Sequence, residues 1–262
     1  MNAGAAAASA PAAQEWRAPA GWRSVECISD LHLQASDPAT LAAWQRYMAA
    51  LRADALFILG DLFDAWVGDD AAEVEGFEQQ CANILSATAR RMPVFFLAGN
   101  RDFLVGAQFA QDTGVQLLQD PTVLVFGPRR WLLSHGDALC IADTEYLAFR
   151  AQVRHPAWQH AFLAQPLAAR QQVARGMRAE SEQLKRSGRE YPDVDTAAAL
   201  QWLAAADADV LVHGHTHRPA EHALDATRRR IVLSDWDAAG VPPRLQALRL
   251  HADGHSERVP LA

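Results

Sequence analysis

Short apolar runs recur along the chain, and each ends abruptly in a cluster of polar residues. Such runs, bounded by turn residues, predict buried strands. The five clearest are VECIS before Asp30, ALFILG before Asp61, VFFLAG before Asn100, WLLS before His135 and DVLVHG before His215. Between the first runs the apolar residues recur at helical spacing, as in the segment that starts with Asp37 as N-cap and Pro38 at the first helical position. Alternating strands and helices predict a largely parallel sheet.

Two further segments predict antiparallel pairing. TVLVFGPRRWLLS is typical of a hairpin that turns at Gly127 and Pro128. The runs IVLSDW and RLQALRL, the second followed by Asp253 and Gly254, indicate more antiparallel strands near the C-terminus. We therefore expect an α/β fold with a mixed sheet or with two sheets.

The stretch from about residue 143 to residue 195 breaks this pattern, because it is helical in composition and has no convincing strand. We interpret it as a helical insertion. Between Arg150 and Glu190 it holds eight Arg and Lys against three acidic residues, in a chain of net charge −7. This contrast indicates an anionic partner. Its apolar residues suit the lining of a pocket: Trp158, Phe162, Leu163, Leu167, Val173 and Met177. The alternative is a helical hairpin that packs on the core and exposes its arginines to solvent.

Composition narrows the class of protein. The 262 residues, half of them hydrophobic, fit one elaborated α/β domain. A net charge of −7 argues against nucleic acid as a partner. Cys27, Cys81 and Cys140 are odd in number and lack metal-type spacing, which favours reduced thiols in a cytoplasm.

The N-terminal residues 1–21 are rich in alanine and contain Pro11 and Pro19, so we expect a flexible extension. A secretory signal is the alternative, but the segment lacks a basic start and a leucine-rich centre. No later stretch reaches the roughly 18 apolar residues that a spanning helix needs. Any membrane contact is therefore expected to be peripheral.

Five polar motifs follow the five predicted strands: DLH from Asp30, GDLFD around Asp61, GNRD around Asn100, HGD from His135 and HGHTH up to His217. Loops after the carboxyl ends of strands form the ligand crevice of open α/β sheets, so these motifs can converge. Each is weak alone, since a lone Asp-x-His is more often a hydrogen-bonded pair than a ligand set. Together they predict a metal centre. His213 lies on the strand side of its glycine, and we leave it out of the site.

The residue types at this centre predict its chemistry. Mixed His, Asp and Asn ligands suit Mn²⁺, Fe²⁺ or Zn²⁺. Two carboxylates, Asp30 and Asp61, beside two divalent ions leave a net positive charge that attracts phosphate. Metal-bound water loses a proton near neutral pH, which provides a nucleophile without a serine or cysteine. We therefore expect direct hydrolysis of a phosphate ester or phosphoanhydride.

The order of the motifs, from about Val25 to Trp236, resembles the calcineurin-like metallophosphoesterase superfamily. The resemblance implies a β-sandwich flanked by helices over residues 22–262, with the insertion as a lid. It implies that one ion is held by Asp30, His32, Asp61 and His217. It implies that the other ion is held by Asp61, Asn100, His135 and His215, with Asp61 as the bridge. The catalytic group would be Asp61, Asn100, Arg101 and His135. Arg101 stands where many members have histidine, so a fixed cation replaces an imidazole.

The segments ILGDLFDAWVGDD, AGNRDFLVG, SHGDALC and HGHTHRPAEH resemble one branch, the UDP-2,3-diacylglucosamine hydrolases of lipid A biosynthesis. The resemblance implies hydrolysis of UDP-2,3-diacylglucosamine to UMP and 2,3-diacylglucosamine 1-phosphate (lipid X), by attack of water on the α-phosphorus with two Mn²⁺ ions. It also implies that the insertion covers the acyl chains.

The same resemblance implies a set of residues close to substrate: Asn100, Arg101, Asp143, Tyr146, Phe149, Arg178, Ser181, Lys185 and His215. Helix capping is an equal alternative for Asp143 and Ser181. The resemblance is weaker after Ser181, because Lys185 and Gly188 stand where the family usually has a polar residue and then a basic one.

A lipid substrate predicts a peripheral enzyme on the cytoplasmic face of the bacterial inner membrane, held by apolar and arginine residues of the insertion. Two alternatives remain. The same metal centre could act on a soluble nucleotide or phosphoprotein, or the fold could serve as a non-catalytic scaffold. The scaffold is disfavoured because all seven predicted ligands are present.

Overall fold

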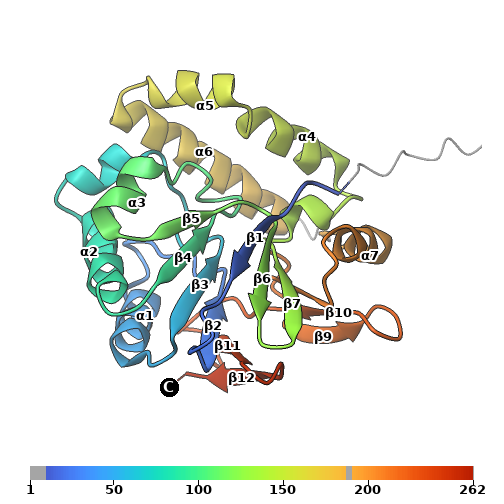
Figure 1. Ribbon diagram of the computed structural model, residues 1–262. Coiled ribbons are helices and arrows are strands. Elements are labelled where there is room, and N and C mark those ends of the chain that lie inside the picture. The colour runs from blue at the N-terminus through green and yellow to red at the C-terminus, as the bar shows by residue number, and fades with distance from the viewer. Residues whose placement is uncertain (1–9, 187–190, 262) are drawn as a thin grey trace, which may run out of the picture.

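Two sheets form the centre of the molecule, in a computed structural model that describes residues 10–186 and 191–261. Sheet A has the order β1-β6-β7-β8-β10-β9, with the bounds Gln14–Arg17, Thr122–Phe126, Arg129–Leu133, Val210–His213, Arg229–Val232 and Ala220–Ala223. Sheet B has the order β12-β11-β2-β3-β4-β5, with the bounds Ser256–Pro260, Gln246–His251, Ser24–Ile28, Ala55–Leu59, Val94–Leu97 and Gln116–Leu118. Figure 1 shows the two sheets side by side, with helices around them.

Strand directions agree with most of the expected pattern. Strands β2 to β5 are parallel, and β6 and β7 form the predicted antiparallel hairpin. Gly127 has φ +60° at its turn, and a side chain there would collide with the carbonyl oxygen of Ala252. Near the C-terminus β11 is antiparallel to β2 and β12. Strand β10 is antiparallel only to β9, since its other neighbour β8 runs parallel to it.

The core lies in three layers that follow the alternation of side chains along the strands. Between the sheets pack large residues of both, among them Phe57, Phe95 and Trp131. Helices α1 (Pro38–Ala50), α2 (Phe77–Ala89) and α3 (Ala107–Thr113) cover the other face of sheet B. Helix α7 (Thr196–Ala205) covers the other face of sheet A. Asp37 accepts a hydrogen bond from Thr40 N–H, so it caps α1 as predicted. This α/β sandwich flanked by helices is the expected fold.

The N-terminal expectation was wrong for part of its range. Residues 14–17 form β1, which pairs in parallel with β6, and Trp16 stacks edge-on against Phe95 with ring centroids 4.6 Å apart. The alanine-rich composition gave no sign of this because the strand is held by distant aromatic residues. Residues 1–9 lie outside the described part of the chain.

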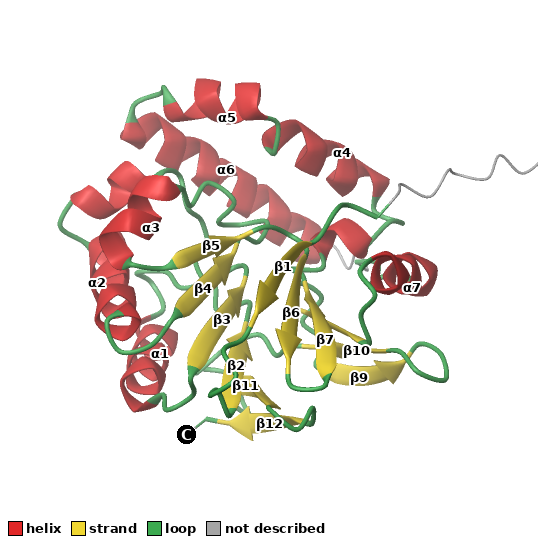
Figure 2. Cartoon of the chain, viewed as in Figure 1, coloured by secondary structure: helices red, strands yellow, loops and turns green. Residues whose placement is uncertain are grey.

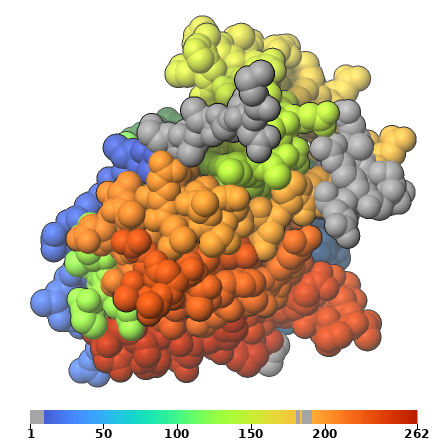
Figure 3. Space-filling view, turned by 90° about the vertical axis from the view of Figure 1, so that its right-hand side faces the viewer, coloured from blue at the N-terminus to red at the C-terminus, as the bar shows by residue number. Residues whose placement is uncertain are grey.

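The insertion is helical, as expected, and comprises α4 (Thr144–Val153), α5 (Pro156–Leu163) and α6 (Leu167–Arg186). Figures 1 and 2 show the three helices together at one end of the sheets, and Figure 3 shows them above the C-terminal part of the chain. Arg170 of α6 is buried and bonds to the carbonyl oxygen of Val67 and to Asp70. Arg154 at the end of α4 donates to the carbonyl oxygen of Gly99 at 2.8 Å. These contacts fix the insertion on the loops that follow β3 and β4.

The apolar residues of the insertion divide into two groups. Trp158, Phe162 and Leu167 pack on the core beneath the insertion. Leu163, Val173 and Met177 remain about 40% exposed. One face of the insertion therefore packs on the core, as in the hairpin alternative, while the other face presents apolar surface. The alternative's solvent-exposed arginines are not found at Arg170, which is buried. Among the described residues no helix combines the length and apolar character needed to cross a membrane.

The remaining short helices are the 3₁₀ turns η1 (Asp69–Glu73) and η2 (Asp137–Leu139). The second of these follows directly after the predicted ligand His135 and places Asp137 in the interior, where it is fully buried. It therefore belongs to the surroundings of the site described next.

Candidate metal centre

The predicted ligands converge from both sheets. From sheet B, Asp30 and His32 follow β2, Asp61 follows β3 and Asn100 follows β4, while from sheet A, His135 follows β7 and His215 and His217 follow β8. Two sheets packed face to face bring the ends of these strands to one edge of the sandwich. The convergence expected from the five motifs is thus present.

The ligand atoms form two overlapping groups, each within 4.8 Å: a first cluster of Asp30, His32 and His217, and a second cluster of Asp30, Asp61 and His135. In the first cluster, Nε2 of His217 lies 3.2 Å from Nε2 of His32 and 3.4 Å from Oδ1 of Asp30. In the second cluster, Nε2 of His135 lies 3.7 Å from Oδ1 of Asp61.

Asp61 and Asn100 connect these groups to the remaining ligands. Oδ2 of Asp61 lies 3.9 Å from Nδ1 of His32, so its two oxygens face opposite clusters. This is the position that a bridging ligand requires. Oδ1 of Asn100 lies 2.9 Å from both His135 Nε2 and His215 Nδ1, which brings these residues to the second cluster.

A buried carboxylate oxygen shows that the residues fit a divalent cation. Oδ2 of Asp30 accepts a hydrogen bond from the backbone N–H of His215, at 2.8 Å. Oδ1 of the same carboxylate is buried and accepts no hydrogen bond from any described residue, although the imidazoles of His32 and His217 face it. An unsatisfied buried oxygen is costly, and a cation among imidazole and carboxylate groups would satisfy it.

The backbone at the candidate ligands is left-handed at several positions rather than extended. Five ligands have φ in the left-handed region: Asp30 (56°), His32 (47°), Asp61 (53°), His215 (65°) and His217 (52°). Non-glycine residues adopt this region rarely, and such strain concentrates at functional sites. The paired side chains of Asp30 and His32, and of His215 and His217, are therefore directed by tight turns rather than by strand alternation.

Charge balance at the centre favours a bound cation. Burial raises the pKa of Asp61 to about 7, an effect that Asp102 and Asp30 add to. Burial lowers the pKa of His135, but the carboxylates of Asp61 and Asp30 outweigh it and raise the pKa to about 9. The metal-free site thus retains protons that a divalent cation would displace.

Asp102 is a component of the site that the sequence reasoning missed. It is fully buried and accepts hydrogen bonds from four backbone N–H groups, those of Gly99, Asp61, Leu62 and Phe63. Burial raises the pKa of its carboxyl group. The carboxylate fixes the loop of Asp61 against the loop of Asn100. The signal for it was its place in the GNRD motif, two residues after Asn100.

Asp137 was also missed, although the HGD motif contains it. Its carboxylate accepts hydrogen bonds from the Tyr146 hydroxyl and from Arg150 Nε, the latter at 2.7 Å. The Tyr146 ring stacks near His215, with centroids 5.9 Å apart. Asp137 therefore ties α4 of the insertion to the metal centre.

Three other predicted substrate contacts have partners within the protein. The Asp143 side chain accepts a hydrogen bond from the backbone N–H of Tyr146 and so caps α4, which agrees with the alternative of helix capping. Nε of Arg178 lies 2.5 Å from Oδ2 of Asp64. The backbone N–H of Arg101 donates to Oδ1 of Asp61 at 2.8 Å.

Phe149 lies on α4 and is 40% exposed. Ser181 and Lys185 are on α6, but their side chains lie outside the described residues. The structure therefore brings Tyr146 to the metal centre and does not test these two positions.

His213 lies in the core, in keeping with its omission from the predicted site. Its Nδ1 is 2.9 Å from the carbonyl oxygen of Gly214, and its Nε2 is 3.5 Å from Arg230. Burial lowers its pKa to about 4. It belongs to neither cluster.

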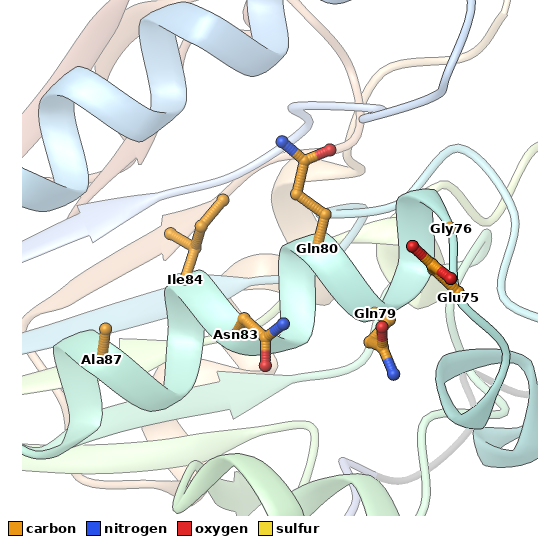
Figure 4. Close-up of a pocket in the computed structure, with 7 residues that line it drawn as sticks. All are labelled: Glu75, Gly76, Gln79, Gln80, Asn83, Ile84 and Ala87. Carbon is orange, nitrogen blue, oxygen red and sulfur yellow. The ribbon is translucent and has the colours of Figure 1, made fainter.

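A separate surface pocket lies along α2, as Figure 4 shows. Its lining includes Glu75, Gln79, Gln80, Asn83 and Ile84. This lining holds no histidine and a single carboxylate, so it lacks the donor set of the metal centre. None of the predicted site residues lies there.

Comparison with known proteins agrees with this geometry. The sequence model of the calcineurin-like phosphoesterase family matches residues 25–219. A protein of Xanthomonas axonopodis pv. citri named UDP-2,3-diacylglucosamine hydrolase is 46% identical, with 87% of this chain and 96% of that protein covered. A protein of the same name from Chromobacterium violaceum is 44% identical, with 81% and 90% covered.

Solved structures with a more distant likeness include an archaeal phosphodiesterase and a phosphoesterase of E. coli. The first has a TM-score of 0.44 at 11% identity and covers 91% of this chain and 99% of its own. The second has a TM-score of 0.44 at 17% identity and covers 91% and 100%.

Proposed function

This chain belongs to the calcineurin-like phosphoesterase family, and from that premise we propose that it hydrolyses the pyrophosphate bond of UDP-2,3-diacylglucosamine. The products are UMP and 2,3-diacylglucosamine 1-phosphate, an intermediate of lipid A biosynthesis. The observation that carries this proposal is the convergence of seven candidate Asp, Asn and His ligands from both sheets, together with an insertion that has exposed apolar residues. The names of the relatives support the choice of substrate.

The cofactor in this proposal is a pair of divalent ions, with Mn²⁺ as the metal. Asp30, His32, Asp61 and His217 would hold one ion, and Asp61 would contribute to both. Asn100, His135 and His215 complete the other site. When bound, the ions would lower the pKa of an attacking water and would supply positive charge for the phosphate oxygens.

The protein's own residues orient the substrate. Arg101 follows Asn100 directly and its backbone N–H bonds to Asp61, and we propose its permanently charged guanidinium as the cation that contacts a phosphate group of the substrate. The Tyr146 hydroxyl donates to Asp137, so the part of Tyr146 that it offers to the substrate is its ring, which lies beside His215. Phe149 on α4, which is 40% exposed, and Arg178 on α6 are further proposed contacts of the insertion, together with Ser181 and Lys185.

We place the enzyme on the cytoplasmic face of the inner membrane, as a peripheral protein. Its lipid substrate resides in a membrane, and the exposed Leu163, Val173 and Met177 offer apolar contact to lipid. Vesicle flotation with anionic lipids tests this placement. Wild-type protein is expected to float, and the triple replacement by Ser is expected to stay in the dense fraction.

The activity itself is tested by UMP release from UDP-2,3-diacylglucosamine by metal-free protein, with and without added Mn²⁺. UDP-GlcNAc and p-nitrophenyl phosphate serve as comparison substrates. Metal-dependent release from the diacylated substrate alone is the expected result. Turnover of only the comparison substrates would keep the metal centre and assign a soluble phosphoester or nucleotide instead.

A further inference from the structure

The two nitrogens of His217 face different partners. Nε2 lies 3.2 Å from His32 Nε2 and 3.4 Å from Asp30 Oδ1, so it faces the first cluster. Nδ1 lies 3.7 Å from Oδ2 of Asp235, which is an ion-pair distance and slightly longer than a hydrogen bond. Asp235 was not among the residues predicted from the sequence.

The backbone holds Asp235 between two elements that carry ligands. The N–H of Leu233 donates to the carbonyl oxygen of His213 at 2.7 Å, and the N–H of Trp236 donates to the carbonyl oxygen of Asp30 at 3.0 Å. These bonds attach the segment after β10 to the end of β8 on one side and to the loop after β2 on the other. Asp235 is buried. Its distance from His217 is therefore set by the same framework that sets the ligands.

Arg244 fixes the direction of the Asp235 carboxylate. Its Nε lies 3.1 Å from both carboxylate oxygens, and its Nη2 lies 3.0 Å from Oδ2. Backbone hydrogen bonds of 2.8 and 3.0 Å between Asp237 and Arg244 hold the arginine in place. A carboxylate held by a guanidinium fork has little freedom to turn away from the imidazole.

We propose that Asp235 is a positioning residue for the metal centre, which keeps His217 in the tautomer and orientation that turn the Nε2 lone pair toward the first cluster. This inference rests on the proposed metal-dependent function. A histidine that binds a metal through one nitrogen needs an acceptor at the other, and a carboxylate or a carbonyl oxygen fulfils that role. His135 shows the carbonyl form, because its Nδ1 lies 3.0 Å from the carbonyl oxygen of Leu59. For His217 the acceptor is the carboxylate of Asp235.

The consequence is specific to one of the two ions. Asp235 faces a ligand of the first cluster only, so its loss weakens the ion held by Asp30, His32 and His217. The second cluster retains its ligands and the acceptor at His135. Loss of such an outer partner lowers metal affinity by about 10- to 100-fold.

The test is Mn²⁺ binding to metal-free protein, followed by the EPR signal of free Mn²⁺, for wild type, Asp235→Ala and Asp235→Asn. Asp237→Asn is the matched control, because Asp237 shares Arg244 with Asp235 at 3.1 Å but is more exposed. We expect two sites in wild type and in the control. We expect one site weakened by about 10- to 100-fold in Asp235→Ala, and a smaller loss in Asp235→Asn, which keeps one oxygen acceptor.

Kinetics separate positioning from a general loss of structure. The Mn²⁺ concentration for half-maximal activity is expected to rise by the same factor in Asp235→Ala, with kcat and KM close to wild type once Mn²⁺ is saturating. If Asp235→Ala does not fold, Asp235→Asn decides the matter. Wild-type Mn²⁺ affinity in the folded Asp235 variants, or an equal loss in Asp237→Asn, would overturn the inference.

The binding experiment contains no substrate, so it fails independently of the proposed function. Wild-type protein that binds two Mn²⁺ ions but releases no UMP would refute the proposed substrate and leave the role of Asp235 open to this test. Wild-type protein that binds no Mn²⁺ would refute both.

Discussion

At the scale of single residues, carboxylates that bind no metal hold the ligand loops in place. Asp102 accepts four backbone N–H groups from two loops, and one of these loops carries Asp61 at φ 53°. A left-handed aspartate is unfavourable by itself, so the surroundings must hold it there. Asp102 supplies that constraint at the base of the second cluster.

Replacing Asp102 by Asn is expected to destabilise the metal-free protein by about 2–4 kcal/mol, because an amide NH₂ faces backbone donors and leaves them unsatisfied in the interior. Urea denaturation measures the change in the free energy of unfolding. Asp112→Asn is the control, since Asp112 is an exposed acid that bonds only locally to Gln108 in the structure. A loss no larger than that of the control would show that Asp102 does not hold the loops.

At the scale of elements, segments outside the five motifs attach to the sandwich through few, identifiable contacts. Strand β1 depends on Trp16, whose ring lies 4.6 Å from Phe95 and 5.2 Å from Trp22. The end of the insertion depends on Asp193, which forms two hydrogen bonds with Arg230 of β10. Each contact gives a prediction.

Trp16→Ala is expected to lower the free energy of unfolding by about 1–3 kcal/mol, less than for a fully buried tryptophan because Trp16 is only partly buried. Strand β1 should then exchange its amide hydrogens faster than β6. Hydrogen exchange detected by mass spectrometry measures this. Arg17→Ala, which removes an exposed side chain of the same strand, should leave both properties unchanged.

Asp193→Asn is expected to lower the free energy of unfolding by about 1–2 kcal/mol at pH 7. The loss is modest because the side chain is 35% exposed and solvent screens its charge. The Arg230 hydrogen bonds lower the pKa of Asp193 to about 2. Since this pKa lies below that of an unfolded aspartate, the stabilisation is complete above about pH 4 and is lost as the pH falls through about 2.

Urea titrations at several pH values, from neutral to about pH 2.5, should therefore show wild type and Asp193→Asn converging in stability as the pH falls. Asp207→Asn, at a side chain that is 98% exposed, serves as the control. A difference between wild type and Asp193→Asn that is constant across the pH range would contradict the ion pair's contribution.

At the scale of the whole molecule, the metal centre joins the two sheets. The second cluster combines Asp61 from sheet B with His135 from sheet A, and the first combines Asp30 with His217 in the same way. An ion bound between sheets exists only in the folded state, so its binding free energy adds to the stability of the sandwich.

Mn²⁺ at 100 times its Kd is expected to stabilise the folded protein by roughly 2.7 kcal/mol. This stabilisation should raise the Tm by about 5–10 °C over that of the metal-free protein. Differential scanning calorimetry with Mn²⁺ and with chelator measures the shift. Asp61→Ala removes the proposed bridging carboxylate, whose two oxygens face the two clusters, and should lose most of the shift. The same shift in that variant would place the ions elsewhere.

The sequence by itself determined most of the elements and pointed to the residues that converge at the candidate metal centre. Strand runs, the Asp37 cap of α1, the hairpin at Gly127 and the helical character of the insertion depend on neighbours close in the chain, so local patterns reveal them. Regular strand ends followed by polar motifs also predicted that the seven candidate ligands lie close together, since such ends converge in an α/β sheet.

Only the tertiary structure decided what surrounds those ligands. Asp102 bonds to a loop 40 residues earlier in the chain, and Asp235 reaches His217 through the pairing of β8 with β10. Strand β1 pairs with β6 across more than a hundred residues. Such contacts arise from sheet order and packing between distant segments, and a linear pattern of apolar and polar residues carries no record of them.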